Sequence, residues 1–532
     1  MVKSRIAIIF VVISVLAVIG AGIFFVRKRA NQNKICRDCN IILITVDSVD
    51  TTHLGLYGYQ RNTSPNLDAW AKTATAFNQY ITTSDLTPVT QTSIQTGLYP
   101  SNSGVVSFSS HLPEDVPTLP EILKKAGYAT AAYGSAPEYY EAGVSGWQQR
   151  RENFQRGFDQ FFDEYFENQI KPTAPSAQAI SAYRWPQQER GVPAGVVDWL
   201  NDAPKQKFFL WVPIGTVHWP YNDNKPFHFA DTNYQGMLRN DTLHWQLPSQ
   251  FKRVYRNEMY PLDGSSPVPL TSADVQFVID RYDDGIYLTD QFLGKVFQTI
   301  KDKGLDKNTI IIFTTEHGEE FGEHGYLAHY DIFEPEIHTP LLMKIPGVAL
   351  SRVSQLVSTV DILPTLLDAV GLRPQGKLDG KSFWSYLGTK SGIPDWFRKY
   401  AFIERTPLME TLMFDSGSPT EKWLIDFLQA DANQHFRDVA VRTTEWKLIY
   451  RESRTAQEKY SWWRRLSGDK TPIPEFELYH LTDTPLEQKN VIAKYPKIAA
   501  DLKRVLIQWI AVGSEKRKLI PPDLEEIGVS GL

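Results

Sequence analysis

The sequence predicts an α/β fold built on a parallel sheet, and three observations support this. Asn40–Val46 and Asn308–Thr315 are uninterrupted runs of β-branched and aromatic residues, typical of strands that a parallel sheet buries on both faces. The residues between the two runs contain helical patterns, including one that begins near Pro65. Both runs end in an acid, at the strand end where open α/β sheets bind ligands.

Length and composition restrict the class of protein. A chain of 532 residues fits one large domain plus a smaller one. The formal net charge of −5 gives no overall indication of a nucleic-acid partner, and an aromatic content of 12% argues against disorder.

The N-terminus has the pattern of a membrane anchor. An apolar run from Ile6 to Val26 follows Lys3 and Arg5, and it is longer than the core of a typical signal peptide. We therefore expect residues 1–29 to form an uncleaved single-pass transmembrane helix and 30–39 to form a linker.

The sequence gives weaker signals about which side of the membrane the rest of the chain lies on. Basic residues at 27–29 would favour a cytoplasmic location for the rest of the chain, but large domains translocate regardless of such charges. Cys36 and Cys39 are the only cysteines, and two are too few for a zinc knuckle. We expect them to form a short disulfide, and the alternative is a pair of free thiols. We therefore expect an extracytoplasmic catalytic domain.

The two strand ends predict a metal site. Asp47 follows the first run, and Glu316 and His317 follow the second. Carboxylate oxygen together with imidazole nitrogen suits a divalent cation such as manganese or zinc better than magnesium or calcium. The alternative is that these side chains are solvated turn residues.

A hydroxyl-rich run, Ser84–Ser93, leads into a short helix that Gly97 ends. With Pro88 near the first helical position, we expect Thr87 to be the N-cap, with its hydroxyl at the positive end of the helix. That position favours an anionic ligand. The alternative is an ordinary N-cap threonine, which is the commoner case.

A series of short motifs runs along most of the chain after the apolar run. They are Asp47 with Leu54-Gly55 and Pro65-Asn66-Leu67-Asp68, Thr96-Gly97-Leu98-Tyr99-Pro100, Pro117–Leu123, Gly127–Thr130, Arg156–Asp159, Phe208–Val212 with Thr216–Tyr221, Tyr282–Leu293, His329–Leu342 with Pro346-Gly347, Asp361–Leu367 and Leu378–Ser382. No single motif is decisive, but in this order they resemble the sulfatase family of the alkaline phosphatase superfamily.

The resemblance implies the architecture. It predicts a three-layer sandwich with a mostly parallel central sheet, as in alkaline phosphatase, over residues 40–390. Residues 391–532 are expected to form a small C-terminal α+β subdomain with antiparallel strands and a final helix near 498–512.

The resemblance also assigns roles by position. Asp47, Glu316 and His317 match metal ligands, His218 matches a histidine that contacts the transferred group, and His329 stands where many members carry lysine. The resemblance implies one divalent cation, and calcium is a further possible metal because the family uses it. Glu323 and His324 are expected only to shape their loop.

Three positions depart from the family pattern. Ser48 replaces a second acid, Gln91 replaces the signature arginine, and Thr87 stands at the nucleophile position. Sulfatases oxidise cysteine or serine there to formylglycine, and threonine cannot be converted. A phosphoryl group bound to threonine can be released by in-line attack of water or another acceptor. In this respect the site resembles those of lipoteichoic acid synthases and phosphoethanolamine transferases, which use a threonine with a single metal.

These features predict a membrane-anchored, metal-dependent hydrolase of sulfate or phosphate esters. Thr87 would be the nucleophile and the fourth metal ligand, while His218 and His329 would stabilise developing charge or protonate the leaving group. The expected substrate is a sulfated or phosphorylated ester, such as a glycan or lipid head group. One alternative is a transferase that moves a phosphoryl head group onto an envelope lipid or glycan, and another is a catalytically inactive binding protein.

Overall fold

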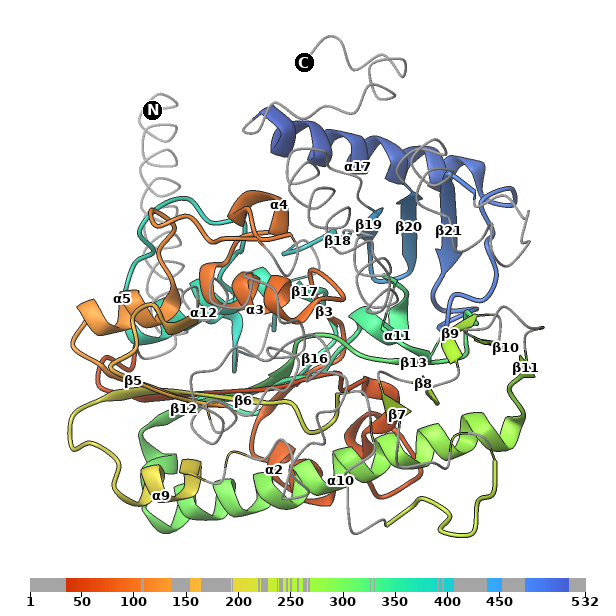
Figure 1. Ribbon diagram of the computed structural model, residues 1–532. Coiled ribbons are helices and arrows are strands. Elements are labelled where there is room, and N and C mark those ends of the chain that lie inside the picture. Colours follow the sequence, from red (N-terminus) through yellow and green to blue (C-terminus); the bar gives the residue numbers. More distant parts are fainter. Residues whose placement is uncertain are drawn as a thin grey trace, which may run out of the picture.

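An eight-stranded sheet lies at the centre of the computed structural model (Figure 1). Its spatial order is β16-β2-β15-β12-β1-β6-β4-β5. Only β15 runs antiparallel to its neighbours, so the prediction of a mostly parallel sheet is confirmed. The strands are β1 Asn40–Val46, β2 Thr75–Phe77, β4 Ala129–Gly134, β5 Gln160–Asp163, β6 Phe208–Ile214, β12 Thr309–Thr315, β15 Leu341–Lys344 and β16 Arg352–Val353.

The structure describes most of the chain between residues 35 and 515. The described residues are 35–106, 110–134, 154–163, 193, 195–218, 221, 228–236, 238, 243–244, 247–248, 251–255, 258–261, 266, 268–325, 327–329, 331–389, 392–394, 397–405, 438–451 and 474–515.

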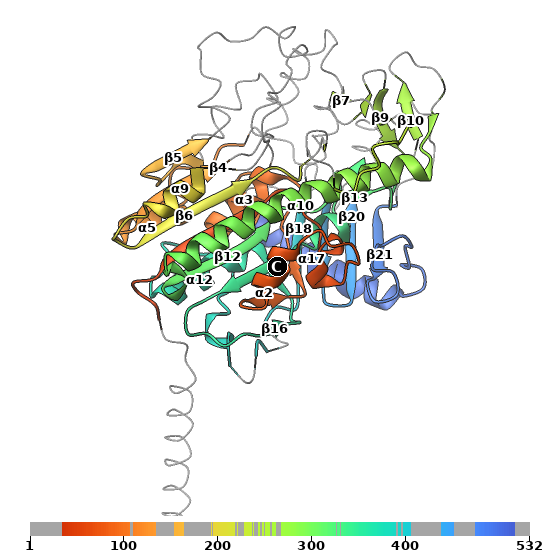
Figure 2. The same cartoon turned by 90° about the horizontal axis from the view of Figure 1, so that it is seen from below.

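Helices cover both faces of the sheet. In Figure 1, α3, α5 and α12 lie above it and α2, α9 and α10 lie below it, and Figure 2 shows α10 crossing the lower face. Ile42 and Ile44 of β1 pack into the core on the α10 side, whereas Ile41 and Leu43 pack on the α12 side. This alternation explains why the strand sequence is apolar at every position. The helices are α2 Pro65–Ala71, α3 Thr87–Thr96, α5 Leu119–Lys125, α9 Gly195–Asn201, α10 Ser272–Asp302 and α12 Ile362–Val370.

The start of α3 differs from the prediction by one residue. Leu86 is the N-cap, and Thr87 is already the first helical residue with Pro88 behind it. Proline is favoured throughout the first turn, so Pro88 does not fix which residue precedes the helix. The predicted end is confirmed, because Gly97 takes the left-handed conformation with φ 68°.

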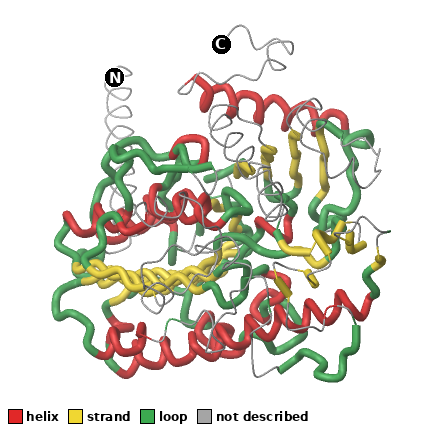
Figure 3. The backbone as a smooth tube through the Cα atoms, in the orientation of Figure 1, coloured by secondary structure: helices red, strands yellow, loops and turns green. Residues whose placement is uncertain are grey.

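A second, antiparallel sheet forms the C-terminal part, as predicted, and Figure 3 shows it beside the larger sheet. The helix α17, Pro496–Glu515, packs against one face of it. The strands are β18 Ala401–Arg405, β19 Asp438–Arg442, β20 Trp446–Arg451 and β21 Phe476–His480. The domain boundaries at 390 and 391 stay a prediction.

Shorter elements connect these layers. They are β3 Tyr80–Ile81, β7 Leu243–His244, β8 Leu247–Pro248, β9 Phe251–Tyr255, β10 Glu258–Pro261, β11 Val268–Pro269, β13 Glu320–Phe321, β14 Leu327–Ala328, β17 Val357–Ser358, α4 Pro100–Ser103 and α11 Glu334–Ile337.

The expected disulfide between Cys36 and Cys39 is present. The expected transmembrane helix at residues 1–29 lies outside the described residues. Among the residues that are described, no helix combines the length and the apolar character that crossing a membrane requires.

Candidate active site

The parallel register brings the predicted acids together. Val46 at the end of β1 pairs with Thr315 at the end of β12, so Asp47 and Glu316 leave the sheet side by side. On the other flank of β1, Val46 pairs with Ile214 of β6. His218 comes after that strand, which places it at the same edge of the sheet as the two acids.

Thr87 lies against Asp47 and His317. Its hydroxyl Oγ1 is 3.1 Å from Asp47 Oδ2 and 3.1 Å from His317 Nε2. The imidazole also approaches the carboxylate, with His317 Nε2 3.1 Å from Asp47 Oδ1. All three residues are buried. A carboxylate and an imidazole that follow two different strands therefore meet at one hydroxyl at the start of a helix.

The tautomer of His317 is set by its second nitrogen. Nδ1 lies 3.0 Å from the backbone carbonyl of Gly318 and donates to it, which directs Nε2 toward Thr87 and Asp47. Burial alone would lower the pKa of His317, but the adjacent Asp47 carboxylate raises it to about 9. Without a cation, Asp47 and His317 form a charge-assisted pair.

Glu316 lies beside Gln91 of α3. Gln91 Nε2 donates to Glu316 Oε1 and also to Thr45 Oγ1 at 2.9 Å. Gln91, at the position where the resemblance predicts an arginine, therefore contacts the acid as a neutral donor. Burial, together with repulsion from Asp47, raises the pKa of Glu316 to about 8.

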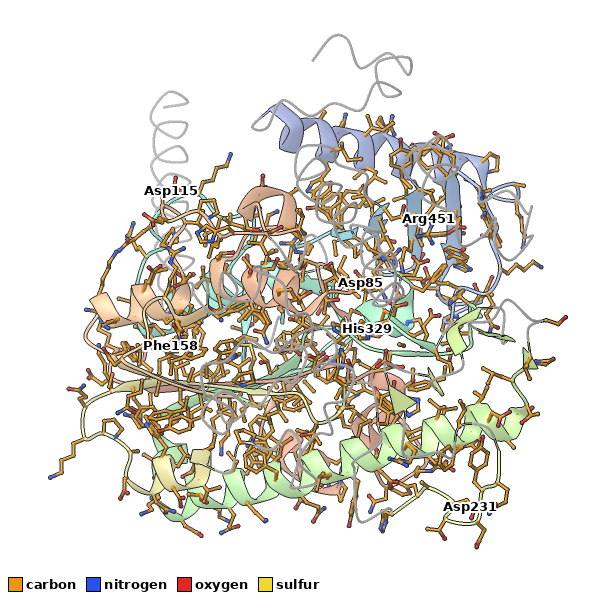
Figure 4. All side chains as sticks on the ribbon, viewed as in Figure 1. Asp85, Asp115, Phe158, Asp231, His329 and Arg451 are labelled. Carbon is orange, nitrogen blue, oxygen red and sulfur yellow. A yellow bond between two sulfur atoms is a disulfide. The ribbon has the colours of Figure 1, made fainter. Side chains whose placement is uncertain are left out.

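Two further histidines border the same space. The ring centroid of His329 is 4.0 Å from that of His317 and 5.0 Å from that of His218. Figure 4 shows His329 near Asp85, between the large sheet and the C-terminal sheet. The structure thus brings all six predicted site residues into one cluster. They are Asp47, Thr87, His218, Glu316, His317 and His329.

Sequence reasoning missed Glu319, which is also part of this cluster. Its Oε1 is 2.8 Å from His329 Nδ1, and its side chain is fully buried. Burial raises the pKa of Glu319 to about 8. Burial also lowers the pKa of His218 to about 4, and it lowers that of His329. The only signal in the sequence was the position of Glu319 two residues after His317.

The turn after Asp47 holds an unusual backbone conformation. Ser48 has φ 59°, a left-handed conformation that is rare for residues other than glycine. Tyr282 of α10 stabilises the turn, because its hydroxyl donates to Ser48 O at 2.6 Å and accepts from Asp50 N at 2.9 Å. Ser48 Oγ also donates to Asp47 Oδ1. The residue that replaces the family's second acid therefore orients the first.

The side chains of this cluster suit a divalent cation by chemistry. Glu316 Oε2 is buried with no hydrogen-bond partner among the described residues, and Nδ1 of His317 is held by a backbone carbonyl, as in many metal-ligating histidines. Within the described part of the chain, however, no three His, Cys, Asp or Glu side chains are arranged as a ready-made metal site. The donors are therefore present, while a closed ligand shell is not.

Glu323 and His324 occupy the same loop but have structural contacts. Glu323 Oε2 accepts from the backbone of Phe321, and His324 Nδ1 lies 2.6 Å from Glu320 Oε1. The His324 ring stacks on Phe333 at 3.6 Å between centroids. These contacts agree with the expectation that the two residues shape the loop.

The C-terminal sheet holds the segment that precedes Thr87. Arg405 at the end of β18 donates from Nε to Asp85 Oδ2 at 3.0 Å, and both side chains are buried. The neighbouring Glu404 donates its backbone N–H to Thr83 O. Two strand-end residues of the smaller sheet thus position the loop that leads to the nucleophile candidate.

Comparisons with known proteins match this chain to a protein family. The family model Sulfatase matches residues 39–372, and the model N-sulphoglucosamine sulphohydrolase, C-terminal, matches residues 322–471. Arylsulfatase K of Gallus gallus is 23% identical over 88% of this chain and 81% of its own length. N-acetylgalactosamine-6-sulfatase of Rattus norvegicus is 24% identical over 63% of this chain and 62% of its own length.

Solved structures share the fold. The phosphonate monoester hydrolase of Agrobacterium radiobacter superposes with a TM-score of 0.61 and 21% identity, covering 89% of this chain and 96% of its own. A protein solved in complex with its substrate D-glucosamine-2-N,6-O-disulfate superposes with a TM-score of 0.61 and 18% identity, covering 90% and 99%.

Proposed function

Because this chain belongs to the sulfatase family of ester hydrolases, we propose that it cleaves phosphate or sulfate esters with Thr87 as the nucleophile. The observation that carries the proposal is the contact of Thr87 Oγ1 with Asp47 Oδ2 and His317 Nε2, each at 3.1 Å. A buried alcohol between a carboxylate and an imidazole is the arrangement of an activated hydroxyl nucleophile.

The residues present fit one divalent cation with Asp47, Glu316, His317 and Thr87 as ligands. Manganese or zinc is favoured by ligand type, and calcium by the family. When bound, such a cation would lower the pKa of the Thr87 hydroxyl and polarise the ester. It would also compensate the negative charge of buried carboxylates that repel one another, as Asp47 and Glu316 do.

The protein's own side chains would do the remaining work. Thr87 Oγ attacks the phosphorus or sulfur atom, while His218 and His329 donate hydrogen bonds to its oxygens or to the leaving group. The ring centroids of His218 and His329 lie 5.0 Å apart. The His329 ring packs against the His317 ring, whose Nε2 contacts Thr87 Oγ1.

The threonine favours phosphoryl over sulfuryl transfer. Formylglycine offers two hydroxyls, and the second one expels sulfate. Threonine has one hydroxyl, so an adduct on Thr87 must be released by in-line attack of water, which phosphoryl groups undergo readily. If an alcohol attacks in place of water, the same adduct gives a transferase.

Paired substrates test this proposal. Turnover of aryl phosphates and aryl sulfates is compared for wild type, Thr87→Ala and Thr96→Ala. Thr96 is a control from the same helix, whose hydroxyl donates to Thr92 O and accepts from the backbone N–H of Leu98. Loss of the nucleophile should reduce kcat by more than about 1,000-fold. Sulfate turnover that survives Thr87→Ala would refute the threonine mechanism. Faster ester cleavage with added alcohol acceptors would identify a transferase, and metal binding without turnover would identify a binding protein.

We also propose that residues 1–29 anchor the protein in a membrane, with the site outside the cytoplasm and a glycan or lipid head group as substrate. The apolar run Ile6–Val26 and the Cys36–Cys39 disulfide support the location. A reporter fused after Leu532 tests it, because a reporter active only in the cytoplasm would refute the placement.

A further inference from the structure

Glu319 and His329 form a buried carboxylate–imidazole pair at the edge of the site. Glu319 Oε1 lies 2.8 Å from His329 Nδ1, and the side chains are 0% and 6% exposed. The Glu319 carboxylate also interacts with the side chain of Tyr221. The contact with Glu319 fixes the His329 ring through one nitrogen, so its Nε2 points away from the carboxylate.

The pair is close to the reacting atoms. The His329 ring lies 4.0 Å from the His317 ring, and His317 Nε2 is 3.1 Å from Thr87 Oγ1. The His329 ring therefore borders the space in which an ester attacked by Thr87 would lie.

We propose that Glu319 is the positioning residue for His329 and that His329 protonates the leaving oxygen, an assignment that rests on the proposed function. As Thr87 Oγ bonds to the phosphorus or sulfur atom, the bond to the leaving oxygen breaks and its electron pair takes the proton from His329 Nε2. At the same time the proton that Glu319 Oε1 donates to His329 Nδ1 moves onto Nδ1, so the ring stays neutral and Nε2 keeps a lone pair. Water that attacks the adduct on Thr87 returns a proton to Nε2.

Leaving-group dependence tests this assignment. Wild type and Glu319→Gln are assayed for kcat/KM on aryl esters of the class that wild type turns over, from 4-nitrophenyl to phenyl. A 4-nitrophenolate leaves without protonation, so Glu319→Gln should lose less than about 5-fold there, but at least about 100-fold on the phenyl ester. A purely structural role would reduce both substrates equally.

The matched control is Glu320→Gln. It removes the same kind of contact in the same loop, because Glu320 Oε1 lies 2.6 Å from His324 Nδ1, but His324 stacks on Phe333 instead of facing the site. Its leaving-group dependence should stay that of wild type.

Metal content, measured on the same samples, separates the remaining outcomes. Glu319→Gln should bind as much metal as wild type, and a loss of bound metal would make Glu319 a ligand and overturn the assignment. Equal losses across the ester series would also overturn it while leaving the proposed function intact. A wild type that turns over no ester would refute the proposed function and this assignment with it.

Discussion

Replacement of Arg405 by methionine is expected to loosen the segment that leads into α3. Arg405 Nε and Asp85 Oδ2 are 3.0 Å apart, and the side chains are only 4% and 2% exposed. Removing one partner of such a pair leaves a buried, uncompensated charge and costs about 3–5 kcal/mol. Burial already raises the pKa of Asp85 to about 6 against the attraction of Arg405. The variant would raise this pKa further.

The cost should appear locally, because Asp85 lies two residues before Thr87. Glu404, beside Arg405, is bonded through its backbone to Thr83 O, so the loop 83–87 depends on the end of β18. A loss of about 3 kcal/mol in the free energy of local opening corresponds to a rise of about 100-fold in the population of the open state.

Native-state hydrogen exchange measured by mass spectrometry gives this quantity directly. Peptides covering 83–97 should exchange about 100-fold faster in Arg405→Met. Asp85→Asn added to this variant should restore most of the protection, because the buried charge is then gone. Lys124→Met is the control, since its ion pair with Asp159 is 47% and 43% exposed and contributes little. Unchanged exchange in Arg405→Met, or no recovery in the double variant, would refute the reasoning.

Two further predictions concern pH and metal. Burial raises the pKa of Asp50 from 3.8 to about 6, so between these values the folded protein holds a proton that the unfolded chain has lost, and stability falls as pH rises through that window. Above pH 6, the free energy of unfolding of Asp50→Asn, measured with urea, should therefore exceed that of wild type by about 3 kcal/mol. The difference should vanish below pH 4. A stability difference that persists at pH 4 would show that the titration of Asp50 is not its cause. Manganese or zinc added to chelator-treated protein should stabilise it by about 2.7 kcal/mol at 100 times Kd, measured by thermal unfolding. Asp47→Asn should abolish this shift and Asp50→Asn should keep it, so equal shifts in the two variants would exclude Asp47 as a ligand.

The parts of the site that lie on regular strands could be predicted from the sequence. An apolar run such as Asn40–Val46 can be satisfied only between two helical layers, and parallel strands end at one edge of the sheet. The strand pattern therefore places Asp47, Glu316 and His317 at one edge of the sheet. They meet because β1 and β12 are neighbours in register, which a run that is apolar at every position does not specify.

Contacts that depend on side-chain direction could not be predicted in this way. Gln91 on α3 reaches Glu316 at the end of β12, and Glu319 contacts His329 ten residues later. Neither contact produces a periodic pattern in the sequence, because each depends on how the loops fold over the edge of the sheet. The shift of the α3 cap from Thr87 to Leu86 has the same origin, because tertiary contacts of the Thr87 hydroxyl outweigh its capping preference.

The departures from the family pattern act on the same electrostatic balance. The resemblance to the family places Gln91 and His329 at positions where arginine and lysine are expected, and these two residues contact Glu316 and Glu319. Burial raises the pKa values of both glutamates to about 8. A site of this composition attracts a phosphate or sulfate ester only when a bound cation or protonated imidazoles supply positive charge. Binding of an anionic ester should thus depend on metal more steeply here than in relatives that keep both basic residues.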